Sequence, residues 1–110
     1  MKLLVRDGWV EAEGLRFKGA YPVLHAFLVN DHVVVIYDWM VFDRGMPARN
    51  LFCYDKSGSE IWRAQDINWG AVDAYTNVTN EAPLWVSNFA GFNCRIDEST
   101  GHVLAMDFTK

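Results

Sequence analysis

The chain has 110 residues, of which 51% are hydrophobic and 15% aromatic, and its formal net charge is −4 at pH 7. This length suits one domain, residues 1–110, with its own core, and so high an aromatic content excludes a disordered chain. The 10 basic residues are scattered along an acidic chain, which opposes a nucleic-acid-binding surface because such a surface needs clustered Lys and Arg.

The distribution of apolar residues also opposes membrane insertion. The longest unbroken apolar run, from Val33 to Tyr37, is far shorter than the roughly 20 residues that span a bilayer. Arg6 and Asp7 interrupt the first apolar run before it reaches the length of a signal sequence. We therefore expect a cytoplasmic protein with reduced cysteines, and opposite strand phases of Cys53 and Cys94 argue further against a disulfide.

Tight turns dominate the N-terminal part. Residues 3–6 and 9–12 flank Asp7-Gly8, a strong hairpin signal, and Glu13-Gly14 leads to a third strand at 15–18. Residues 24–29 fit either a buried helical turn or a strand. We favour the strand, because Asn30-Asp31 accepts a two-residue turn and the β-branched run 32–37 returns from it.

The middle of the chain is less regular. Residues 38–50 show no clear period, residues 66–70 read as a loop, and residues 71–76 fit either a strand or a short helix. The last segment predicts strands at 84–86, 92–96 and 102–108.

One hairpin pattern occurs twice, at residues 52–62 and 94–104. In each copy an apolar strand ends at an Asp, a small hydroxyl residue precedes a Gly, and an apolar strand returns (Asp55 to Gly58, Asp97 to Gly101). The pattern resembles the blade hairpin of quinoprotein-type (PQQ-like) β-propeller repeats, most closely over residues 84–108. The resemblance implies blade-like hairpins, but the chain is too short to close a propeller and no position matches that family's cofactor or metal residues.

These patterns predict an all-β fold, an antiparallel meander of about 8–11 short strands with propeller-blade-like hairpins. The alternatives are a small β-barrel, or an α+β fold with one or two short helices.

No catalytic, metal or cofactor motif has diagnostic spacing, so we predict no cofactor. Asp38 and Asp43 could form an acid–base pair across the irregular segment, although solvated loop carboxylates or partners for Arg44 and Arg49 are the commoner roles for such residues.

The aromatic residues of the irregular segments are the best binding candidates. Trp39 and Trp69 lie beside polar residues, as rings at binding hot spots do. Together with the loop residues around them, they give the predicted contact surface: Asp38, Trp39, Met40, Phe42, Asp43, Arg44, Arg49 and Trp69.

Two functions remain open at this stage. The first is a non-enzymatic interaction module, most simply a homo-oligomer or a module with a protein partner, because a short meander leaves edge strands that need cover. The second is a domain that binds a small apolar or aromatic ligand, or a small hydrolase or isomerase, with a pocket lined by Trp39, Trp69, Tyr37 and Tyr75.

Overall fold

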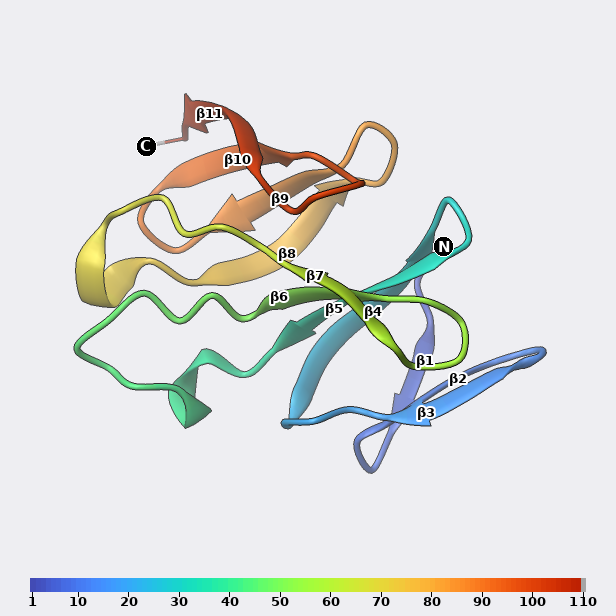
Figure 1. Cartoon of the computed structure of the whole chain (residues 1–110). Coiled ribbons are helices and arrows are strands. Elements are labelled where there is room, and N and C mark those ends of the chain that lie inside the picture. The colour runs from blue at the N-terminus through green and yellow to red at the C-terminus, as the bar shows by residue number, and fades with distance from the viewer. Residues whose placement is uncertain (110) are drawn as a thin grey trace.

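The computed structural model describes residues 1–109, which form eleven β-strands in three antiparallel sheets (Figure 1). The predicted all-β antiparallel fold is confirmed. None of the three sheets in this part of the chain closes into a barrel, and its only helical elements are two three-residue 3-10 turns, η1 (Trp39–Val41) and η2 (Gly70–Val72). The strands are β1 Leu4–Arg6, β2 Trp9–Ala12, β3 Leu15–Lys18, β4 Val23–Val29, β5 His32–Tyr37, β6 Leu51–Tyr54, β7 Glu60–Arg63, β8 Tyr75–Asn80, β9 Trp85–Asn88, β10 Phe92–Ile96 and β11 Val103–Phe108.

The three sheets follow one another along the chain. Their strand orders are β1-β2-β3, β4-β5-β6-β7 and β11-β10-β9-β8, so every neighbour in a sheet is also a neighbour in sequence. Figure 1 shows β8–β11 above, β4–β7 in the centre and β1–β3 below. Of residues 71–76, which fitted a strand or a short helix, 71–72 end η2, 73–74 form a short connection and 75–76 begin β8.

The predicted turn chemistry is confirmed at the β1–β2 and β4–β5 hairpins. Asp7 and Gly8 have φ of 51° and 80°, and Asn30 and Asp31 have φ of 49° and 65°. Two successive positive φ values give the type I′ turn, whose twist matches that of the flanking strands. Residues 24–29 are therefore a strand rather than a helical turn, and β4 pairs with β5 through Asn30-Asp31.

The central sheet is buried on both faces, which explains the unbroken apolar run of β5. Val34 and Ile36 belong to a core cluster shared with β8–β11, whereas Val33 and Val35 belong to a second cluster shared with β1–β3. Successive residues of a strand face opposite sides, so a strand with sheets on both sides has no position for a polar residue.

The repeated hairpins use their Asp residues as predicted. Asp55 Oδ1 accepts the backbone N–H groups of Ser57 and Ser59, and Asp97 Oδ1 accepts that of Ser99. The hairpins join β6 to β7 and β10 to β11, in two different sheets. Each of these two sheets is a four-stranded meander, and the resemblance to propeller repeats stays a prediction.

Both cysteines are free, as predicted, but the reason given for it was wrong. Cys53 and Cys94 do not face different environments, because both side chains are buried in the cluster between the second and third sheets. Burial raises the pKa of each thiol to about 12, so both are neutral and shielded from solvent.

Candidate functional site

Five aromatic rings lie on η1, the loop at η2, the β9–β10 turn, the start of β10 and the end of β11. Four of them are exposed and Phe92 is half-buried. We call these five rings the aromatic surface: Trp39, Trp69, Phe89, Phe92 and Phe108. Phe89 and Phe108 expose 61% and 67% of their area, and Trp39 and Trp69 expose 40% and 51%. Further exposed apolar side chains lie on the same 3-10 turns and loops: Met40, Val41, Met46 and Val72.

The rings pack in two groups, one of two rings and one of three. Trp39 stacks on Phe89, with 6.5 Å between ring centroids and 23° between planes. Trp69 meets the edge of Phe92 at 5.0 Å, and Phe92 contacts Phe108 at 5.5 Å. The β9–β10 turn carries Phe89 and leads into Phe92, so it contributes to both groups.

Two buried polar residues that the sequence analysis missed hold the loops of this surface. Asp73 is 1% exposed; its carboxylate accepts the backbone N–H groups of Ile67 and Trp69 and the side-chain amide of Asn88. The same residues tie the loop of Trp69 to the strand that precedes Phe89. In the sequence, the role of Asp73 is indicated only by its position between the apolar residues Val72 and Ala74. An exposed acidic residue in a loop can have the same neighbours, so the sequence alone does not distinguish the two cases.

Asn50 connects the second and third sheets in the same way. Its side-chain amide donates to the carbonyl groups of Tyr37 and Tyr75, and its Oδ1 accepts the N–H of Tyr75. Asn50 is fully buried, and all three bonds are 2.8 Å long. It thus fixes the end of the irregular segment 38–50 against β8.

The structure divides the predicted contact surface. Trp39, Met40 and Trp69 lie exposed at the aromatic surface, and Asp38 supports η1 by accepting the N–H of Met40. The remaining predicted residues face elsewhere or serve their own loop. Phe42 packs on Tyr21 at 4.7 Å, Asp43 caps the N–H of Gly45, Arg44 is exposed, and Arg49 donates to the carbonyl group of Ala64.

The predicted aromatic pocket does not form. Tyr37 and Tyr75 are both fully buried and belong to different core clusters, whereas Trp39 and Trp69 lie on the surface. Tyr37 and Tyr54 share a hydroxyl–hydroxyl hydrogen bond of 2.6 Å inside the core, and burial raises the pKa of both phenols. These groups stabilise the core and reach no solvent-filled cavity.

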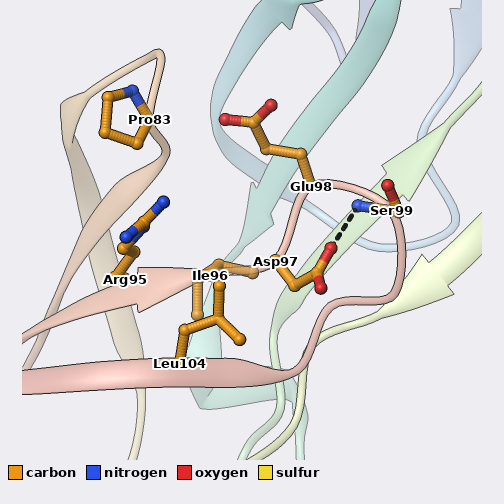
Figure 2. Close-up of a pocket in the computed structure, with 7 residues that line it drawn as sticks. All are labelled: Pro83, Arg95, Ile96, Asp97, Glu98, Ser99 and Leu104. Atoms are coloured by element: carbon orange, nitrogen blue, oxygen red, sulfur yellow. Dashed lines mark hydrogen bonds between the residues drawn. The ribbon is translucent and has the colours of Figure 1, made fainter.

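A polar cleft beside the β10–β11 turn also lacks an acid–base pair. Figure 2 shows that the carboxylates of Asp97 and Glu98 point in different directions. Asp97 accepts the N–H of Ser99, while Glu98 accepts the N–H of Leu84 and the side-chain amide of Asn30. Glu98 therefore connects the second and third sheets by hydrogen bonds. Residues 1–109 contain no cluster of three His, Cys, Asp or Glu side chains that could hold a metal ion.

No helix within residues 1–109 has the length and apolar character needed to cross a membrane. Fold and surface thus define a small all-β protein with exposed aromatic rings. A family model described as a domain of unknown function (DUF7957) matches residues 10–108, so the chain belongs to that family. No curated protein and no solved structure matches the chain.

Proposed function

We propose that this protein is a non-enzymatic interaction module that self-associates through the aromatic surface, with a second copy of the chain as its partner. The observation that carries the proposal is that one group of packed rings, formed by Trp69, Phe92 and Phe108, leads into the apolar edge strand β11. Phe108, the most exposed of these rings, is the last residue of β11.

The edge strands differ in how they are protected. Residues 1–3 cover part of β4, where the N–H of Leu3 donates to Ala26 and that of Leu28 donates to Met1. β3 and β7 carry charged residues, and β8 is mostly polar, as edge strands of natural proteins commonly are. β11 has the sequence VLAMDF, with one charge and with Leu104, Met106 and Phe108 exposed. Such an edge favours pairing with another strand.

The sequence of β11 suits an identical partner. In an antiparallel pair centred on Ala105, Asp107 lies opposite Val103 of the second copy, and Met106 lies opposite Leu104. In this register no like charges face each other. This matters in a two-fold symmetric interface, because each contact occurs twice and any repulsion is doubled.

The area of the rings also favours a combined interface. Since a large ring buries about 200 Å², the four most exposed rings would bury about 400 Å² per protomer. A stable interface needs about 800 Å² per partner, so the rings supply about half and β11 with its neighbouring apolar side chains must supply the rest.

The cellular location is part of the same proposal. We place the module in the cytoplasm, a compartment in which the two free thiols of Cys53 and Cys94 would stay reduced.

Light scattering coupled to size-exclusion chromatography tests the proposal. The wild type should have twice the monomer mass at high concentration, whereas Phe89→Ser and Met106→Lys should each shift the protein to monomer. Leu4→Ser is the matched control, because Leu4 is 52% exposed on β1, outside the aromatic surface, and should leave the mass unchanged. A wild type that is monomeric at all concentrations contradicts the proposal, as does an equal effect of Leu4→Ser.

A further inference from the structure

Two arginines share a cleft that no function described above uses. The cleft has a volume of about 290 Å³ and is lined by six polar residues: Arg49, Arg63, Gln65, Asp66, Thr100 and His102. Arg49 lies just before β6, and Arg63 is the last residue of β7. Thr100 and His102 lie in the β10–β11 turn. The cleft thus lies where the second and third sheets meet.

The backbone holds the two arginine side chains in place. Arg63 donates from Nε to the carbonyl group of Arg49 at 2.8 Å and from Nη2 to that of Ala48 at 3.0 Å. Arg49 donates from Nε to the carbonyl group of Ala64 at 3.1 Å. Each guanidinium is therefore oriented through Nε while its Nη1 amino group makes no hydrogen bond within residues 1–109.

Neither arginine forms an ion pair within residues 1–109. The ion pairs of the described residues involve Met1, Arg16 and Lys56, so no carboxylate lies within 4.0 Å of the nitrogens of Arg49 or Arg63. Burial, and then the neighbouring charge of Arg49, lowers the pKa of Arg63. Two neighbouring cations without an ion-pair partner attract an anion.

The backbone of Arg49 gives an independent observation. Its φ is 47°, and the other non-glycine residues with positive φ in residues 1–109 are all Asn or Asp, which adopt this conformation readily. Strained backbone of this kind is concentrated at functional sites. Here it directs the carbonyl group of Arg49 to Arg63 and so fixes the arginine pair.

We propose that this cleft binds an oxyanion, with the free amino groups of Arg49 and Arg63 donating to it from one side and Thr100 and His102 lining the other. Arginine is suited to this role because its planar guanidinium matches the geometry of carboxylate and phosphate oxygens. Asp66 places a negative charge in the same cleft, which favours a singly charged carboxylate over a doubly charged phosphate. The proposal does not rest on self-association, because none of the six lining residues belongs to the aromatic surface.

Nuclear magnetic resonance titrations of the full chain test the site with two probes, sodium acetate and inorganic phosphate, at constant ionic strength maintained with chloride. Acetate should cause saturable shifts in the arginine side-chain signals of Arg49 and Arg63 and in the amide of Thr100, at lower concentration than phosphate does. If phosphate binds more tightly, the site is an oxyanion site but the role given to Asp66 is wrong. Absence of saturable shifts with both probes overturns the proposal.

Variants separate the cleft from general charge effects. Arg49→Gly keeps the positive φ and should weaken acetate binding about tenfold, whereas Arg44→Gly removes an exposed arginine outside the cleft and should leave binding unchanged. Asp66→Asn should tighten binding of both probes, phosphate more than acetate. Equal effects of Arg49→Gly and Arg44→Gly overturn the proposal, as does weaker binding in Asp66→Asn.

Discussion

The β10–β11 turn permits a test of how backbone strain and packing combine at one glycine. Gly101 has a φ of +78°, and a Cβ atom added there would lie 2.6 Å from Cε3 of Trp62 and 2.9 Å from its Cδ2. Gly14 has nearly the same φ, +74°, but a Cβ atom there would meet nothing within 4 Å. The two glycines therefore differ in packing and share the conformational requirement.

Alanine substitutions should separate these two contributions. Gly14→Ala forces a side chain into the left-handed region and should lower the free energy of unfolding by about 1–2 kcal/mol. Gly101→Ala has the same strain and also displaces the buried Trp62 ring, which adds about 1–3 kcal/mol, for a total of about 2–5 kcal/mol. Ser99→Ala should cost much less, because Ser99 is exposed and the turn uses its backbone N–H.

Urea unfolding followed by tryptophan fluorescence measures the three free energies, and equal slopes against urea concentration make them comparable. Gly101→Val should cost even more than Gly101→Ala, because its larger side chain penetrates further into the Trp62 ring. Equal losses for Gly101→Ala and Gly14→Ala would refute the packing argument. Equal, small losses for Gly101→Val and Ser99→Ala would refute the turn assignment itself.

Three further outcomes are expected. Asn50→Ala should lower the free energy of unfolding by more than about 2 kcal/mol, because it leaves buried backbone groups of Tyr75 unpaired. Asn77→Ala is the control, because Asn77 is exposed, and a similar loss of stability in both variants would contradict the role of Asn50. Burial raises the pKa of the Cys53 thiol from 9.0 to about 12, so its contribution to stability is complete below pH 9 and is lost as the pH rises toward 12. In urea unfolding, the free energy of unfolding of Cys53→Ala should therefore depend less on pH than that of the wild type. The same pH dependence in both proteins would contradict this expectation. The pKa of Asp55 is lowered, chiefly by the hydrogen bond from the Ser57 hydroxyl. The carboxylate therefore stabilises the turn above the pKa that Asp55 has in the unfolded chain, and this stabilisation is lost as the pH falls through the pKa of the folded state. A carbon-detected titration should find a higher pKa of Asp55 in Ser57→Ala, and an unchanged pKa would exclude that hydroxyl as the cause.

Local patterns were sufficient to predict most of the fold. Asp7-Gly8 and Asn30-Asp31 are chemically suited to left-handed turns, and the structure uses them as such. The run 32–37 was correctly predicted as a strand because β-branched residues favour that conformation. Its continuous apolar character reflects a sheet buried on both faces, a feature that the sequence analysis did not predict.

The site could be predicted only in part, because its residues are brought together by packing of distant segments. Trp39 and Trp69 stood out as rings in irregular segments, and both are exposed. Phe89 did not stand out, since it occupies a turn whose position beside η1 depends on the stacking of two sheets. Asp73 and Asn50 act through hydrogen bonds to residues whose identity the local sequence does not indicate.

Hydrogen exchange at high and low protein concentration tests self-association most directly, because it reports which backbone amides the partner protects. We predict that amides of residues 103–108 and of the β9–β10 turn exchange more slowly at high concentration, while those of β1 exchange at the same rate at both. Exchange in β11 that is independent of concentration would contradict the proposed interface.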